Sequence, residues 1–157
     1  MIQRIQSLFI IVALAAFVAC FFFPFWNYSG TNPGYVYLVS IFSVKCISGV
    51  DQGAMIGTIP VIVLVSVSII ISVVSFFYYK KREMQIKMNN YNLFITLIFI
   101  GTIFLWIPYT IQEKLPASTY EWRFGLVLPL IAIVCLLLAN VFIRKDEKLV
   151  KSADRLR

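Results

Sequence analysis

The sequence predicts an all-α transmembrane protein, a four-helix antiparallel membrane bundle that forms a single domain over residues 1–157. Apolar residues make up 61% of the chain and charged residues only 13%, whereas about a quarter of the residues are charged in ordinary soluble domains. Four apolar stretches of about 20 residues or more are each long enough to cross a hydrocarbon core of about 30 Å as a helix. These predicted spans are residues 7–26, 54–79, 93–111 and 124–143.

The first span follows Arg4 and resembles a secretory signal in outline. Its apolar run is longer than the roughly 7–15 residues of a signal core. Cys20 is followed by bulky aromatic residues rather than by a polar tether, which argues against a lipidated N-terminus. We therefore expect residues 7–26 to remain as an uncleaved membrane anchor.

The first loop, residues 27–53, contains a strand-like segment. Turn residues at 29–34 precede a β-branched and aromatic run at 35–44, which is too short to span a membrane as a helix. Residues 25–29 can pair with this run across the turn. The sequence thus predicts a small β-hairpin in the first extracytoplasmic loop, with a short helix on the membrane surface as the alternative.

Three glycines repeat at four-residue spacing where this loop meets the second span: Gly49, Gly53 and Gly57. Small residues at this spacing allow helices to approach closely. We expect a helix-packing role within the chain, and an oligomer or partner interface is the alternative.

The second loop, residues 80–90, is short and basic, so the second and third spans should form an antiparallel hairpin. Asn89, Asn90 or Asn92 is expected to cap the third helix at its N-terminus. The third loop, residues 112–123, carries charges of both signs and is expected only to connect two spans.

Pro60, Pro108 and Pro129 lie in the outer halves of the second, third and fourth spans. Proline inside a helix removes a hydrogen bond and kinks it. The three prolines could therefore splay the outer end of the bundle and open a lipid-facing crevice.

The tail, residues 144–157, should continue the fourth helix as a cytoplasmic amphipathic helix. Leu149, Val150 and Ala153 fall on one face at helical spacing, among basic residues. Such a helix lies on anionic lipid headgroups or binds a partner.

Basic residues are concentrated on one side of the predicted spans. Of the 14 Lys and Arg, one precedes the first span, four lie in the second loop and six in the tail. The positive-inside rule then places both termini in the cytoplasm. This distribution indicates a lipid-facing rim rather than a nucleic-acid-binding surface. The candidate contacts with headgroups or a partner are Lys80, Lys81, Arg82, Lys87, Arg144, Lys145, Lys148, Lys151, Arg155 and Arg157.

The residue types leave little scope for catalysis. The chain has no histidine, which excludes histidine-based zinc sites and serine–histidine systems. Its acidic residues lie outside the spans or at their edges, so a proton- or sodium-coupled carrier is not expected. Asn140 is the most polar residue within a span, and the serines and threonines there are expected to be ordinary helix-packing groups. We predict no catalytic, cofactor-binding or metal-binding residue and no enzyme activity.

Three short stretches on the predicted cytoplasmic side carry a family resemblance: MIQRIQ at residues 1–6, KREMQIK at 81–87 and IRKDEKLVKSADRLR at 143–157. On these stretches the chain resembles a family of small four-helix membrane proteins, found mainly in the Bacteroidota and catalogued only as a domain of unknown function. The resemblance implies a bacterial inner membrane and supplies no activity. Pro24 and Trp26 before a β-forming loop also look like claudin-type tetraspans, at the level of fold alone.

The sequence therefore favours a non-enzymatic membrane scaffold or accessory subunit that contacts the lipid bilayer and a membrane-protein partner or a second copy of itself. The alternative is a small channel or carrier for an uncharged or lipid-like molecule, working through the outer half of the bundle.

Overall fold

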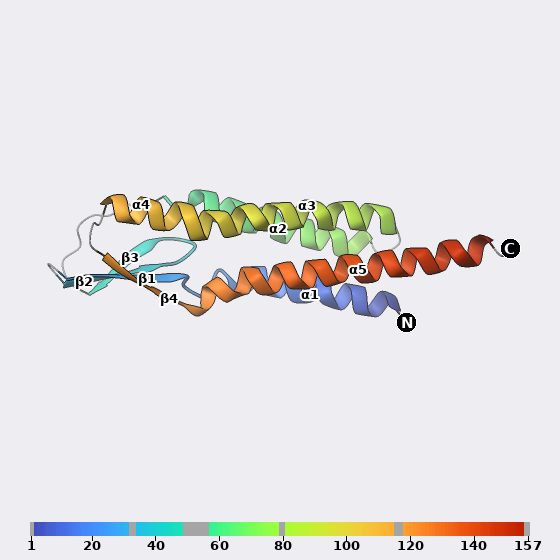
Figure 1. The fold of residues 1–157 in the computed structure, drawn as a ribbon, viewed down its shortest axis with the longest axis horizontal. Helices are drawn as coiled ribbons and strands as arrows, with labels where there is room; N and C mark the ends of the chain where they lie inside the picture. The colour runs from blue at the N-terminus through green and yellow to red at the C-terminus, as the bar shows by residue number, and fades with distance from the viewer. Residues whose placement is uncertain (1, 32–33, 49–56, 79–80, 115–117, 156–157) are drawn as a thin grey trace.

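The molecule is an elongated set of helices with a small sheet at one end and both chain termini at the other (Figure 1). The computed structural model describes residues 2–31, 34–48, 57–78, 81–114 and 118–155. Within these residues, three helices are long and apolar enough to cross a membrane, and a shorter apolar helix covers Gln6–Ala19. The three are Ile59–Phe77, Arg82–Glu113 and Phe124–Glu147. The chain is thus a mostly helical protein whose helices are suited to a membrane.

Helix α1 (Ile2–Ala19) ends before the end of the predicted span at residue 26. Pro24 cannot donate a backbone hydrogen bond, and it disfavours helical geometry at the preceding residue. The chain therefore turns after α1, and the backbone N–H of Phe25 donates to the Val39 carbonyl at 2.9 Å. The aromatic end of the predicted span belongs to the sheet instead.

Two of the three prolines begin helices rather than kink them. Pro60 lies in the first turn of α2 (Ile59–Phe77), and Pro129 lies in the first turn of α5 (Val127–Arg155). A proline in the first turn loses no helical hydrogen bond, because the N–H groups there have no partner within the helix. The kinks expected at these two positions are therefore absent from the described helices.

The third helical rod begins earlier than predicted. Helix α3 (Arg82–Gly101) includes most of the segment expected to be a loop. It continues through a π-helical segment, Thr102–Trp106, into α4 (Ile107–Lys114). Pro108 is the second residue of α4, so the wider π-helical turn lies just before the position where proline removes a helical hydrogen bond.

Helix α5 runs without a break from Val127 to Arg155. The first part of the tail therefore continues the fourth span as a helix, as the sequence predicts. Gly125, in the short 3-10 turn Phe124–Leu126 before α5, donates its N–H to the Pro24 carbonyl at 3.0 Å. This bond holds the start of α5 against the turn that follows α1.

The sheet has four antiparallel strands in the order β3–β2–β1–β4. Its strands are β1 (Trp26–Thr31), β2 (Gly34–Val39), β3 (Val44–Ser48) and β4 (Ser118–Trp122). Strands β1 and β2 form the predicted hairpin, with Trp26 opposite Val39. Strand β4 lies in the segment expected only to connect two spans, and it pairs with β1, so that Trp26 also faces Trp122. The all-α prediction was therefore incomplete.

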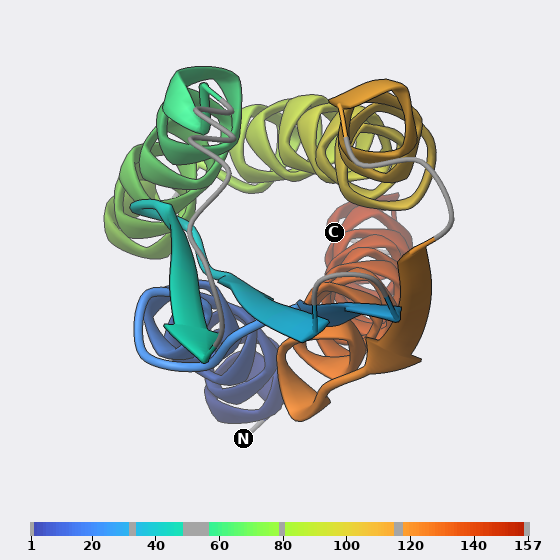
Figure 2. The same ribbon diagram turned by 90° about the vertical axis from the view of Figure 1, so that its left-hand side faces the viewer.

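Each helical rod contacts two others. Helix α1 packs against α2 and α5, and α3 packs against the same two helices. Figure 2, viewed from the sheet end, shows the rods at four corners and the sheet across the ends of α1 and α5.

Candidate functional site

The middle of helix α3 buries several polar side chains and exposes apolar ones. Tyr91, Phe94 and Leu97 are about 60% exposed, whereas Asn89 and Asn92 are fully buried. A helix at the surface of a water-soluble protein shows the reverse pattern. In lipid, polar groups must be satisfied inside the protein, so this inversion supports a membrane location independently of helix length.

The inward-facing polar side chains come from three helices, and we call them the polar row. On α2 and on α3 they recur at intervals of three and four residues, which places them on one face of each helix. Each member is at most 7% exposed. The members are Ser68, Ser72 and Ser75 of α2, Gln85, Asn89, Asn92 and Thr96 of α3, and Asn140 of α5.

Asn89 joins α3 to α5. Its amide nitrogen donates to the Leu136 carbonyl and to the Asn140 side-chain oxygen, both at 3.0 Å. The Asn140 amide nitrogen in turn donates to the Asn90 side-chain oxygen at 2.8 Å. Asn89 and Asn92 thus lie inside α3, and the prediction that one of these asparagines caps the helix was wrong because α3 begins at Arg82.

Asn92 and Gln85 join α3 to α2. The Asn92 amide nitrogen donates to the Ser72 hydroxyl at 2.7 Å, and Ser72 donates to the Ser68 carbonyl at 2.8 Å. The Gln85 amide nitrogen donates to the Ser75 carbonyl at 3.2 Å. Two of the serines expected to be ordinary packing groups therefore accept hydrogen bonds between helices, Ser72 through its hydroxyl and Ser75 through its backbone carbonyl.

Five oxygen atoms of the polar row are buried without a hydrogen-bond partner among the residues that the structure describes. An unpaired buried polar group is costly, and most such groups in folded proteins have a partner. The five are Gln85 Oε1, Asn89 Oδ1, Asn92 Oδ1, Ser68 Oγ and Ser75 Oγ.

An ion pair lies where the polar row meets the end of the molecule that carries the termini. Arg82 Nε is 2.9 Å from Asp146 Oδ2, and the two side chains are 23% and 12% exposed. Arg82 and Gln85 are three residues apart on α3, so this pair lies about one turn beyond the polar row.

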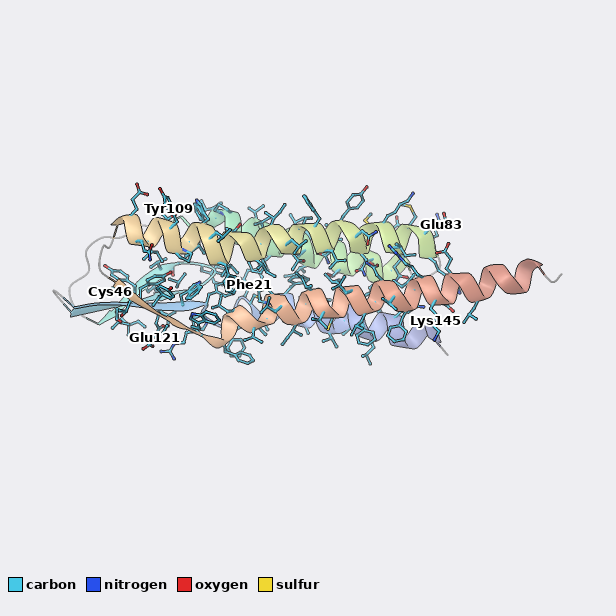
Figure 3. The ribbon with its side chains drawn as sticks, in the orientation of Figure 1. Phe21, Cys46, Glu83, Tyr109, Glu121 and Lys145 are labelled. Carbon is cyan, nitrogen blue, oxygen red and sulfur yellow. The ribbon has the colours of Figure 1, made fainter. Side chains whose placement is uncertain are left out.

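Four of the other predicted contacts with headgroups or a partner belong to the same end of the described chain. Lys81, Lys87, Arg144 and Lys145 are exposed, and Figure 3 places Lys145 and Glu83 near the termini, opposite Cys46 and Glu121 at the sheet end. Arg82, in contrast, is engaged with Asp146. Lys80 lies outside the described residues, as do the side chains of Lys148, Lys151, Arg155 and Arg157.

The glycine repeat is described only in part. Gly49 and Gly53 lie outside the described residues. A Cβ atom added at Gly57 would meet no atom within 4 Å among the described residues, so Gly57 lies in open space rather than at a close contact between described helices. The helix-packing role expected for the repeat, and the alternative interface role, both remain predictions.

The interior at the sheet end is apolar, and we call it the apolar layer. Phe25, Tyr37, Phe99 and Ile103 have no or almost no exposure, and the rings of Phe25 and Phe99 lie edge to face with centroids 6.2 Å apart. Aromatic side chains from the sheet therefore fill the space between the helix ends. Within the described ranges, no three His, Cys, Asp or Glu side chains are grouped as metal ligands.

Tyr28 of β1 is fully buried in this layer. Burial raises the pKa of its phenol to about 12, and the neighbouring Tyr120 adds a smaller rise. Its hydroxyl, like Trp26 Nε1, has no partner within the described part of the chain.

The polar row was the main feature that the sequence reading missed. The sequence does contain a signal for it. Ser68, Ser72 and Ser75 are spaced by four and then three residues, and the same spacing recurs in Gln85, Asn89 and Asn92. It was obscured because the α3 residues lie in a charged segment that resembles a loop.

Comparison with known proteins gives a family but no activity. A family model described as a domain of unknown function (DUF4293) matches residues 2–156. No curated protein matches the chain.

Proposed function

The chain belongs to the DUF4293 family of domains of unknown function, and from its geometry we propose that it is a non-enzymatic scaffold or accessory subunit of the bacterial inner membrane. The helices form a four-helix antiparallel bundle that anchors the chain, with both termini in the cytoplasm. The basic end of the molecule contacts anionic lipid headgroups and positions the tail helix beside them.

One observation carries this proposal. The exposed basic side chains Lys81, Lys87, Arg144 and Lys145 belong to the start of α3, with the residue before it, and to the later part of α5. The Arg82–Asp146 ion pair holds these two regions together, and Figure 1 shows the start of α3 toward the end that holds both termini. Each Lys or Arg near an anionic membrane surface contributes about 1 kcal/mol of attraction. Two helices therefore present one basic rim at the level where cytoplasmic headgroups would lie.

The opposite end supports this orientation. Trp26 and Trp122 face each other across β1 and β4, and Trp122 is exposed. Tryptophan is enriched at membrane–water interfaces, and cytoplasmic segments carry the excess of Lys and Arg. The sheet end then lies at the outer interface.

The alternative function, a channel or carrier for an uncharged or lipid-like molecule, has less support. It requires open space in the outer half of the bundle. There Phe25, Phe99 and Ile103 are fully buried members of one hydrophobic cluster. Pro60 and Pro129 begin helices there and do not splay them.

Lipid retention in bilayer discs tests the role of the basic rim. The full chain would be reconstituted with mixed neutral and anionic lipids, and the lipids that remain bound would be counted by native mass spectrometry. Changing Lys81, Lys87, Arg144 and Lys145 to Gln should abolish the preference for anionic lipid. The matched control exchanges Lys and Arg at the same four positions and keeps the charge, and Lys45→Gln removes a charge at the sheet end.

Crosslinking in native membranes tests the scaffold role itself. A photoreactive residue placed at Tyr91, which is exposed and is not one of the substituted positions, should capture a specific membrane-protein partner or a second copy of the chain, and the four-Gln variant should lose that product. The proposal fails if the intact protein gives no specific product, or if the Gln and charge-retaining variants hold anionic lipid equally well.

A further inference from the structure

The unpaired atoms of the polar row, within the described chain, are oxygens, while its amide nitrogens are used. The orientation of each amide follows from its partners. The Asn89 nitrogen contacts two oxygen acceptors, the Leu136 carbonyl and the Asn140 side-chain oxygen. The Gln85 nitrogen contacts the Ser75 carbonyl. A carbonyl oxygen can only accept, so the free atoms of these two amides must be their oxygens.

The orientation of Asn92 follows from one further step. Its partner is the Ser72 hydroxyl, which has a single proton. Ser72 donates that proton to the Ser68 carbonyl and can therefore only accept from Asn92. The free atom of Asn92 is its oxygen as well. Gln85, Asn89 and Asn92 thus present three carbonyl oxygens that need a donor.

The chemistry of these atoms restricts the ligand to a hydrogen-bond donor or a cation. Anions are excluded because the free carbonyl oxygens only accept. Divalent cations favour carboxylate ligands, and the polar row contains none. Asp146, the buried carboxylate about one turn beyond the row, is already paired with Arg82. The exposed Lys81 and Lys145 at this end would also repel a cation that approached from the basic end.

The spacing of the free oxygens decides between a single ligand and several. Gln85, Asn89 and Asn92 follow one another at intervals of four and three residues, which spreads their side chains over about 10 Å of helix. One ion cannot contact oxygens that far apart, because cation–oxygen distances are about 2–3 Å. Ser75 lies beside Gln85 and Ser68 lies beside Ser72, so the unpaired hydroxyls accompany the two ends of this series.

We propose that the polar row binds a file of water molecules, which reaches from the Arg82–Asp146 pair to the level of Asn92. Buried water typically makes about three hydrogen bonds to groups that are otherwise unsatisfied, and the five free oxygens supply acceptors at successive levels. The file ends where Phe99 and Ile103 begin the apolar layer. The helix interior between Arg82 and Asn92 would then hold buried water, and this inference does not depend on the scaffold role.

Water-edited solid-state NMR of the protein in bilayers tests this directly. Magnetisation from mobile water should reach the side-chain amides of Gln85, Asn89 and Asn92 about as quickly as that of the exposed Asn90. The methyl groups of Ile103 should remain slow and serve as the dry control. Amides of the polar row that behave like Ile103 would overturn the proposal.

Serine variants provide a second test that preserves the fold. The Ser68 and Ser75 hydroxyls make no hydrogen bond within the described chain, so Ser68→Ala with Ser75→Ala removes water ligands but no described bond between helices. Water transfer to Gln85 and Asn92 should slow in this variant, with an unchanged melting midpoint. Ser66→Ala, on a half-buried face of α2, is the matched control. Equal transfer rates in both variants would count against the file of water.

A cation titration distinguishes water from an ion. The melting midpoint would be measured in sodium, potassium, ammonium and N-methylglucamine chlorides at equal ionic strength. The proposal requires equal midpoints in all four salts. A rise with one small cation that disappears in Asn92→Leu would show a cation site and would overturn the proposal.

Discussion

The two halves of the helical interior are held together by different interactions. In the apolar layer, aromatic rings pack between the helix ends, as that of Phe25, the residue before β1, does against Phe99. In the polar row, side-chain amides join α3 to α2 and α5 through hydrogen bonds. Lipid tails are as apolar as leucine, so the hydrophobic effect does not draw membrane helices together. The difference indicates that contacts between helices near the basic end depend on side-chain hydrogen bonds. Contacts near the sheet depend on the complementary shapes of packed apolar side chains.

This contrast predicts different costs for removing a side chain from each half. Phe99→Ala leaves a cavity beneath Phe25 and should lower the free energy of unfolding by about 3 kcal/mol. Phe94→Ala, on the exposed face of the same helix, should have a much smaller effect. Reversible unfolding in mixed micelles measures both. Equal losses would show that the apolar layer does not depend on packing.

The junction between the turn after α1 and the start of α5 should be the next most sensitive point. A Cβ atom at Gly125 would lie 2.8 Å from the Phe23 carbonyl oxygen and closer still to that of Pro24. Gly125→Ala should therefore cost about 2 kcal/mol. Gly101→Ala, where a Cβ atom meets no described atom within 4 Å, should be neutral or stabilise by up to about 1 kcal/mol. The same unfolding assay contradicts this prediction if the two variants behave alike.

Loss of an amide in the polar row should cost less than loss of Phe99. Asn89→Ala removes bonds to Leu136 and Asn140, and we expect a loss of about 1 kcal/mol, since such bonds between membrane helices contribute about 0.6–2 kcal/mol. A double-mutant cycle with Asn140→Ala isolates the coupling between the two amides. A loss as large as that of Phe99→Ala, or no coupling, would contradict the proposed difference between the halves.

Tyr28→Phe should have the smallest effect at neutral pH, because the Tyr28 hydroxyl has no partner in the described chain. At alkaline pH the effect should appear. Burial raises the pKa of Tyr28 to about 12, so the folded protein keeps this proton at a pH where an unfolded tyrosine, with a pKa of about 10, loses it. The contribution of the protonated Tyr28 phenol to the free energy of unfolding is fully present below about pH 10 and is lost as the pH rises toward about 12.

Melting midpoints measured across this range check the prediction. Tyr28→Phe should flatten the alkaline decline, while Tyr109→Phe, which removes an exposed hydroxyl, should leave it unchanged. An identical decline in all three proteins would show that Tyr28 does not contribute to it.

The sequence predicted elements that depend on local composition. The apolar runs located the helices, and the turn residues located the hairpin of β1 and β2. Strand β4 was missed because its five residues include Glu121 and form a strand only by pairing with β1, far away in the sequence. The early end of α1 follows from Pro24, a local signal that the length of the apolar run obscured.

The polar row was missed for a different reason. Rules for polar residues come largely from water-soluble proteins, in which asparagine favours caps and turns. In a membrane the polar face of an amphipathic helix is the buried one. Asn89 and Asn92 therefore lie in the middle of α3 and face the interior of the bundle. Which oxygens remain unpaired depends on contacts with α2 and α5 and could not be read from α3 alone.

The pairing of β1 with β4 also sets the order of biogenesis. A ribosome completes β1 and β2 early, but β4 follows three of the four helical rods in the chain. The sheet cannot close until the segment after α4 has been synthesised. We therefore expect sheet closure to be a late step that joins the two helical hairpins, and truncation before Ser118 should leave the edge of β1 that pairs with β4 open to quality-control proteases.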